Sequence, residues 1–111
     1  MRVADTSLQF SASDIVNFAG CNYATLLDVR VAKEGLTPPE DSTSDLLRRK
    51  GLDHEAAVLE QYRASGQRVA DLSSVPWRDR QYSTNAAMRL GVDIIYQGML
   101  STDRWLGIID F

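Results

Sequence analysis

The feature that most constrains this chain is a pair of apolar, strand-like runs near its C-terminal end. The first is VDIIYQGML, residues 92–100, and the second is WLGIIDF, residues 105–111. Only STDR separates them, which is a hairpin-length connection, so we expect two antiparallel strands. A two-stranded ribbon is marginally stable alone. Other elements, or further strands, must therefore cover this pair.

The second run contains an acid among aliphatic residues. Strand alternation places Leu106, Ile108 and Asp110 on the same face. Burying an unpaired carboxylate is costly, so such a group shifts its pKa or requires a cation. Asp110 is therefore expected at an exposed strand end or beside a partner such as a metal ion.

Two short helices and a loop are predicted in the N-terminal part. The segment SASDIVNFAG predicts a helix with Ser13 as N-cap and Gly20 at its end. CNYATLLDVRVAKEG predicts a second helix that stops at Gly35. Pro38 and Pro39 predict a loop, since proline fits neither a helix interior nor a strand ladder.

The longest predicted helix runs from Asp45 to Ser65, with Ser44 as its cap and Gly66 after its end. Glycine lowers helix stability by about 1 kcal/mol relative to alanine, so Gly51 inside it suggests a point where a backbone or a ligand approaches. An apolar face with helical spacing is predicted at Leu47, Gly51, His54 and Val58.

Between this helix and the strand pair, QRVADL predicts a weak strand. Thr84 predicts the cap of a short helix over NAAMRL, which Gly91 ends. Helices followed by an antiparallel strand pair indicate an α+β fold. We expect residues 1–111 to form a single domain.

Composition restricts the function classes. Hydrophobic residues make up 44% and charged residues 24%, as in an ordinary soluble globular protein. The formal net charge of −3 gives none of the basic footprint that is usual for nucleic-acid binding. We see neither the apolar core of a signal peptide nor a run long enough to cross a membrane. One cysteine allows no internal disulfide, so we expect a cytoplasmic protein.

Three side chains could contribute to chemistry. His54, the only histidine, is either a buried residue bonded to a carbonyl or a ligand. Glu55 follows it, about 100° around the helix. Cys21, the only cysteine, is most simply a small buried side chain. A metal or cluster site at Cys21 would need several more sulfurs than this sequence contains.

A basic run lies on the same long helix, at Arg48, Arg49 and Lys50. Such runs are usually a solvated helix face, and contact with phosphates is the alternative.

The order of these motifs resembles a known family. SASDIVNFAGC, then RRKGLDHE, then GVDIIYQGML with WLGIIDF, resembles the N-terminal portion of RecB-like nucleases of the PD-(D/E)XK superfamily. The similarity is greatest to a bacterial branch in which some members are fused to helicase domains. It runs over nearly the whole chain. It implies an incomplete PD-(D/E)XK (restriction-endonuclease-like) core, with residues 1–111 as the N-terminal part of a longer nuclease domain.

The resemblance also implies roles for single residues. His54 and Asp110 correspond to catalytic residues that bind Mg²⁺ or Mn²⁺, and Gly107 to the small residue before that aspartate. Glu55 corresponds to a frequent companion acid of the histidine. Cys21 corresponds to the first cysteine of relatives that hold a [4Fe–4S] cluster. We expect the long helix to pack across the two strands and to bring His54 towards Asp110.

The implied function is that of a metal-dependent DNA exonuclease in DNA repair. Its partner would be DNA, as single strands or duplex ends, and a helicase domain could belong to the same chain. An E-x-K acid and lysine should follow Asp110, and these residues and the later cysteines are missing from this sequence. We therefore expect the 111-residue chain alone to be inactive.

Two other interpretations stay open. A non-catalytic α+β interaction or scaffold module would explain the acidic pI and the missing residues. A structural zinc or other metal site using Cys21 and His54 would need more ligands than these two.

Overall fold

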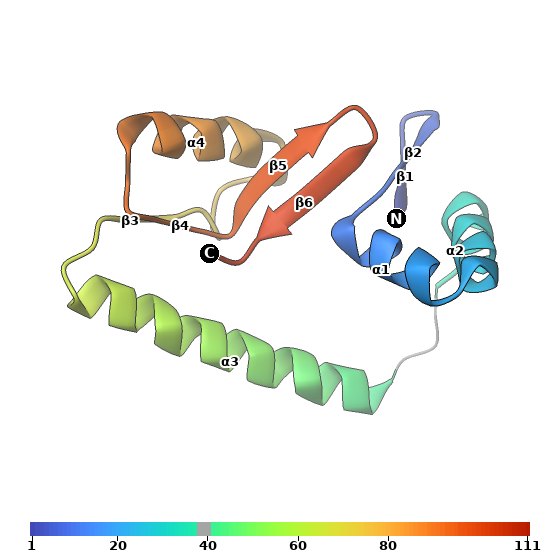
Figure 1. Cartoon of the computed structure of the whole chain (residues 1–111), viewed down its shortest axis with the longest axis horizontal. Helices are drawn as coiled ribbons and strands as arrows, with labels where there is room; N and C mark the ends of the chain where they lie inside the picture. The colour runs from blue at the N-terminus through green and yellow to red at the C-terminus, as the bar shows by residue number, and fades with distance from the viewer. Residues whose placement is uncertain (38–40) are drawn as a thin grey trace. The chain divides into compact units, whose positions relative to one another are not determined.

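The computed structural model describes residues 1–37 and 41–111. This described part of the chain contains four helices and six short strands (Figure 1). The predicted α+β class is confirmed, whereas the PD-(D/E)XK core stays a prediction. The loop predicted at Pro38 and Pro39 lies outside the described residues.

The chain divides into two compact units. The first contains the described residues 1–37 with Ser101–Gly107, and the second contains residues 41–100 with Ile108–Phe111. Strands β5 (Gly98–Thr102) and β6 (Trp105–Ile109) pair as a two-stranded sheet that contributes residues to both units.

The first unit opens with a hairpin that the sequence analysis does not predict. β1 (Arg2–Ala4) and β2 (Ser7–Gln9) pair in antiparallel fashion, with Val3 opposite Leu8. Asp5 in the turn has φ 54°, in the left-handed region that aspartate enters more readily than most residues. The strands are too short to give a clear alternation. The prediction that helices come first in the chain is therefore wrong.

Phe10 connects this hairpin to Arg104, Trp105 and Leu106 of the same unit. Its N–H donates to the Arg104 carbonyl at 2.7 Å, and its carbonyl accepts from the Leu106 N–H at 2.8 Å. Its ring centroid lies 5.5 Å from that of Trp105. These contacts join segments from opposite ends of the sequence within one unit.

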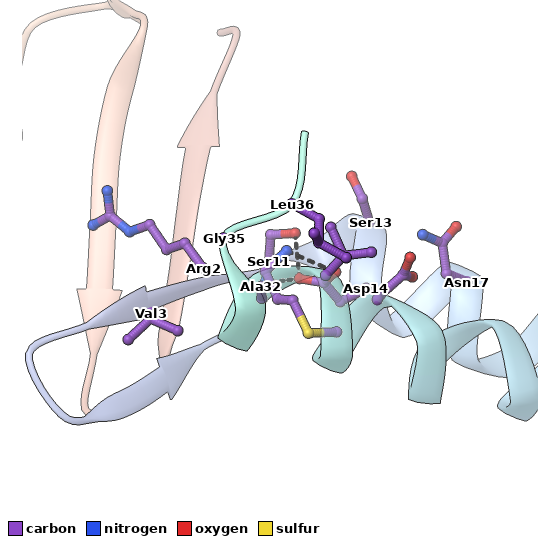
Figure 2. Close-up of a pocket in the computed structure, with 12 residues that line it drawn as sticks. Arg2, Val3, Ser11, Ser13, Asp14, Asn17, Ala32, Gly35 and Leu36 are labelled. Carbon is purple, nitrogen blue, oxygen red and sulfur yellow. Dashed lines mark hydrogen bonds and ion pairs between the residues drawn. The ribbon is translucent and has the colours of Figure 1, made fainter. Parts of the chain in front are cut away.

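The N-cap of helix α1 (Ala12–Gly20) is Ser11, so the predicted cap Ser13 is wrong. The N–H and the hydroxyl of Ser11 both donate to Asp14 Oδ2 at 2.7 Å (Figure 2). Asp14 Oδ1 accepts from the Met1 ammonium at 2.9 Å. Ser11 is the cap because it lies three residues before an acid that can bond back to its N–H.

Helix α2 (Asn22–Glu34) agrees with the prediction. Gly35 follows it at φ 64°, a left-handed conformation that glycine adopts without steric cost, and its N–H donates to the Val31 carbonyl.

Helix α3 (Ser42–Ala64) begins earlier than predicted, because Asp41 rather than Ser44 is its N-cap. The Asp41 side chain accepts from the Thr43 N–H at 3.0 Å. The Ser44 hydroxyl also donates to Asp41, at 2.7 Å, so Ser44 lies inside the first turn.

The inward face of α3 differs from the predicted one. Leu59 is buried, and its neighbours on the same face, Glu55, Val58 and Tyr62, are half-buried. In chain order (55, 58, 59, 62) these positions are three, one and three residues apart, as on one face of a helix. Three residues of the predicted apolar stripe are exposed instead: Leu47, Gly51 and His54. Apart from the helix's own backbone, a Cβ added at Gly51 would meet no described residue within 4 Å, so none of the described backbone approaches there. The apolar pattern predicts the wrong face because a charged residue, Glu55, lies on the face of α3 that packs.

Strands β3 (Val69–Asp71) and β4 (Ile94–Tyr96) pair in parallel, with Ala70 opposite Ile95. A parallel pair needs a long crossover, and helix α4 (Trp77–Leu90) provides it. The single strand predicted over residues 92–100 is wrong, because Gln97 interrupts it between β4 and β5.

The helix predicted to begin at Thr84 begins seven residues earlier, at Trp77, with Pro76 as N-cap. Thr84 lies inside α4 and is fully buried. Its Oγ1 donates to the Arg80 carbonyl at 2.8 Å and accepts from the Met99 N–H at 2.9 Å. Threonine is a common cap, but here its hydroxyl joins α4 to β5.

Gly98 allows this close approach of β5 to α4. A Cβ at Gly98 would lie 3.2 Å from Ile95 Cγ2 and 3.3 Å from Thr84 Cγ2. Among the described residues, the buried apolar side chains all belong to the second unit: Leu59, Leu72, Ala87, Tyr96 and Met99.

Thr84→Val is expected to destabilise the chain by about 1–3 kcal/mol, because it leaves the buried Met99 N–H without a partner. Denaturant unfolding measures the effect. The matched change Thr102→Val, at an exposed strand position, should stay within about 0.5 kcal/mol of wild type. Equal stability of the two variants would contradict the role of the Thr84 hydroxyl.

Asp14→Asn is expected to flatten the acid dependence of stability. Burial raises the pKa of Asp14, but hydrogen bonds from the Met1 ammonium and Ser11 outweigh burial and hold this pKa below 3.8. Ionised Asp14 therefore stabilises the fold above its unfolded pKa of about 3.9, and this contribution is lost as the pH falls through the folded pKa.

The measurement is denaturant unfolding from about pH 6 down to about pH 2, across the carboxylate range. Asp14→Asn should lower the free energy of unfolding by about 1 kcal/mol near pH 6 and by much less near pH 2. Asp5→Asn, at an exposed turn position, is the control. If the free energy of unfolding changed with pH in the same way for wild type and Asp14→Asn, the prediction would be refuted.

Candidate functional site

The predicted site residues of the second unit lie on α3 and immediately after β6. His54 and Glu55 are neighbours on α3, and Asp110 is the first residue after β6. The side chains of His54 and Asp110 are exposed, and that of Glu55 is half-buried. Asp110 therefore lies at an exposed strand end, which is one of the two environments that the sequence predicts for it. The interpretation of His54 as a buried, satisfied residue is wrong.

Glu55 faces the break between β4 and β5. Its Oε2 accepts two hydrogen bonds, from the Tyr96 hydroxyl and from Gln97 Nε2, each at 3.1 Å. Within the described residues, Oε1 receives no hydrogen bond. One oxygen thus fixes the carboxylate in place, and the other is left to accept from a further group.

Gln97 also contacts the residue after β6. Its backbone N–H donates to the carbonyl of Asp110 at 3.2 Å. The structure therefore brings Glu55, rather than His54, into contact with the residue that bonds Asp110.

Three aromatic rings lie beside this hydrogen-bond network. The Phe111 ring centroid is 5.2 Å from that of Tyr96 and 5.6 Å from that of Tyr62. Tyr96 is only 9% exposed, so the hydrogen bond from its hydroxyl to Glu55 is partly shielded from water. Hydrogen bonds to a charged group are stronger there than in bulk water.

Burial and the neighbouring Glu55 carboxylate together raise the pKa of Tyr96 above 10.0. Ionisation of Tyr96 would remove its hydrogen bond and place two negative charges side by side. The network is therefore complete at neutral pH.

The remaining candidates lie apart from this network in the sequence. Arg48, Arg49 and Lys50 are exposed near the start of α3, and Arg48 lies 3.5 Å from the Asp45 carboxylate. Exposed pairs of this kind contribute little to stability. The phosphate-contact role of this run stays a prediction.

Cys21 belongs to the first unit. It is exposed, so the interpretation of Cys21 as a small buried residue is wrong. It lies at the junction of α1 and α2, where it is the N-cap residue of α2. Its role as a cluster ligand stays a prediction.

The donor set for a divalent cation is incomplete. His54, Glu55 and Asp110 offer imidazole and carboxylate ligands, the kinds that suit Mg²⁺ or Mn²⁺. Across residues 1–37 and 41–111, however, no three His, Cys, Asp or Glu side chains are grouped so that they could hold a metal ion. The described residues therefore do not form a complete site for Mg²⁺, Mn²⁺ or zinc.

The first unit contains a cavity of about 640 Å³ between β1, α1 and α2 (Figure 2). Its buried acid, Asp14, is already bonded to Ser11 and to the Met1 ammonium. None of the residues predicted from the sequence for a site lines it. Ser11 and Asp14 therefore act in capping α1.

Tyr96 and Gln97 are the two residues of the network that sequence reasoning missed. The signal that could have found them is the polar pair YQ inside an otherwise apolar run, immediately before Gly98. A glutamine there fits poorly on the buried face of a continuous strand, and its polar groups need partners.

Comparison with protein-family models, with curated proteins and with solved structures finds no match for this chain. Among the described residues, no helix combines the length and the apolar character that a membrane crossing requires.

Glu55→Gln is expected to lower the pKa of Tyr96 towards the ordinary tyrosine value, because it removes the neighbouring negative charge. Part of the elevation should persist, since burial remains. Alkaline titration followed by tyrosinate absorbance measures this pKa, and Tyr96→Phe identifies its signal. Glu60→Gln, at an exposed position on α3 paired with Arg63, should leave the titration unchanged. An unaltered Tyr96 pKa in Glu55→Gln would contradict the contact.

Proposed function

We propose that this chain supplies part of the active site of a metal-dependent DNA nuclease with a PD-(D/E)XK core. The motif order described above supports this interpretation. The observation that carries it in the structure is the double contact of Gln97, which bonds the Glu55 side chain and the Asp110 backbone. An acid of α3 and the residue after β6 are thereby tied to one residue.

In this proposal, Asp110 and His54 are ligands of a divalent cation, and Glu55 is an accessory acid. Both proposed ligands are exposed, which leaves them accessible to an ion and to a substrate. Arg48, Arg49 and Lys50 are the proposed phosphate contacts, and their exposure on α3 suits that role.

The cation would be Mg²⁺ or Mn²⁺, since oxygen and imidazole ligands suit these ions. Because the described residues form no three-ligand group, they do not by themselves assemble a hydrolytic site. The proposal therefore needs an additional acid and a lysine beyond those described, and the chain alone is expected to be inactive. A [4Fe–4S] cluster at Cys21 would likewise need further cysteines. The proposed substrate is DNA, as single strands or duplex ends, the proposed location is the cytoplasm, and the proposed companion is a helicase domain of the same chain.

A non-catalytic interaction module is the second candidate. The observation that favours it is the set of large apolar side chains exposed on α1 and α2 of the first unit: Ile15, Val16, Phe18, Tyr23, Leu26 and Leu27. These two helices pack together, and exposed apolar side chains on neighbouring helices would suit contact with a partner.

Weak Mn²⁺ binding by the 111-residue chain, measured by the relaxation of water protons, tests the nuclease proposal. Asp110→Ala and His54→Ala are each expected to reduce it strongly, because each removes one of only two proposed ligands. The control Glu60→Ala removes an exposed acid of α3 and should bind as wild type does. Binding that is the same in wild type, Asp110→Ala and His54→Ala would refute the assignment.

A further inference from the structure

The cavity of the first unit contains polar groups that the capping of α1 does not use. Ser13 and Asn17 line it from α1, and Asp28 lines it from α2 (Figure 2). Within the part of the chain that the structure describes, none of these three side chains makes a hydrogen bond or an ion pair. Polar groups shielded from water normally have partners. The cavity therefore has hydrogen-bonding capacity that the fold itself leaves unused.

Helical spacing explains why these residues line one cavity. Ser13 and Asn17 are four residues apart on α1, so their side chains lie on the same face. Asp28 and Ala32 have the same spacing on α2, and Val31 belongs to that face as well. The two helices pack against each other. The cavity thus receives polar groups from both helices and an apolar wall from α2.

Asp28 is a half-buried carboxylate with no cation paired to it among the described residues. Its oxygens are not among the sealed, unbonded polar atoms, so they remain accessible. The other acid of the cavity, Asp14, is neutralised by the Met1 ammonium at 2.9 Å. Figure 2 shows the Arg2 side chain extending away from Asp14, and its Nε donates to Gln9 at 2.8 Å. A negative charge is therefore left to attract a cation.

We propose that this cavity is a binding site for a small organic molecule that carries a primary ammonium group on an aliphatic chain. A primary ammonium has three N–H donors and no acceptor. The Asp28 carboxylate, the Ser13 hydroxyl and the Asn17 side-chain carbonyl provide three acceptors for it. Val31 and Ala32 provide an apolar surface for the aliphatic chain. This site belongs to the first unit and does not depend on the proposed nuclease function.

The size and the charge of the cavity favour this class of ligand over others. Its volume of about 640 Å³ lies within the range of about 300–1,000 Å³ that is usual for small-molecule sites. An anion would meet the unpaired charge of Asp28. A divalent cation would find too few carboxylates, because the described residues include no group of three metal-ligating side chains.

The test titrates the full chain with 1-aminopentane and follows the backbone amide signals by NMR. The signals of Ser13, Asn17, Asp28 and Val31 should shift together as the amine binds. Pentanoate and 1-pentanol have a similar length without the positive charge, and each should bind at least about tenfold more weakly, since hydrogen bonds to charged groups are the stronger ones. Binding of either compound as tightly as 1-aminopentane would overturn the inference.

The variant Asp28→Asn keeps the shape of the side chain and removes its charge. It should weaken the binding of 1-aminopentane about tenfold or more. Glu34→Gln removes a charge from an exposed position of α2 outside the cavity, and it should bind as wild type does. Equal affinity of wild type and Asp28→Asn would overturn the assignment.

Unfolding by denaturant separates a ligand-binding role of Asp28 from a structural one. Because its carboxylate has no partner to lose among the described residues, Asp28→Asn should not raise the unfolding equilibrium constant. A rise of about tenfold would identify Asp28 as a structural residue and overturn the inference.

Two further probes distinguish other sources of positive charge. Nα-acetyl-lysine amide presents the ammonium as a protein side chain would, and Ca²⁺ is a compact cation. Both should bind more weakly than 1-aminopentane, because the amide groups of the first would lose water against an apolar wall and the second needs more oxygen ligands. Tighter binding of either probe would overturn the assignment of a free aliphatic amine.

Discussion

The hydrogen bonds that Glu55 accepts join α3 to the break between β4 and β5 in the second unit, and the Arg63–Asp71 ion pair joins the same helix to β3. This helix has 23 residues, yet Leu59 is its one buried side chain among those described. Apolar burial alone therefore contributes little to the packing of this helix. A half-buried carboxylate needs partners to offset the loss of water, and Tyr96 and Gln97 provide them. Tyr62 adds an aromatic contact with Phe111, further along the same face of the helix.

The same constraint decides which part of α3 faces the candidate site. A histidine on a helix draws attention because its chemistry is versatile, but His54 is exposed while its neighbour is the residue held in place. A helix turns about 100° per residue, so adjacent side chains cannot share one contact. Glu55 is consequently the α3 residue tied to the break between β4 and β5, and through Gln97 to Asp110.

The errors in the predicted starts of α1 and α3 have one physical origin. Serine, threonine and aspartate all have cap chemistry, and several of them compete near each start. Asp41 replaces the predicted Ser44 because its carboxylate reaches the Thr43 N–H. Thr84 serves neither as a cap nor at the surface, since its hydroxyl satisfies the Met99 N–H in the interior. No local pattern indicates that partner, which lies fifteen residues away.

The sequence by itself determined what depends on neighbours in the chain: the helices, their glycine ends at Gly35 and Gly91, the apolar strands and the α+β class. Glu55 and Asp110 were also identified as candidate residues from the sequence, whereas Tyr96 and Gln97 were not. Tertiary structure alone decided the packed face of α3, the parallel pairing of β3 with β4, and the break at Gln97. Helical and strand periods arise from local backbone geometry, whereas a polar group such as Glu55 becomes part of a packed face only when distant donors meet it.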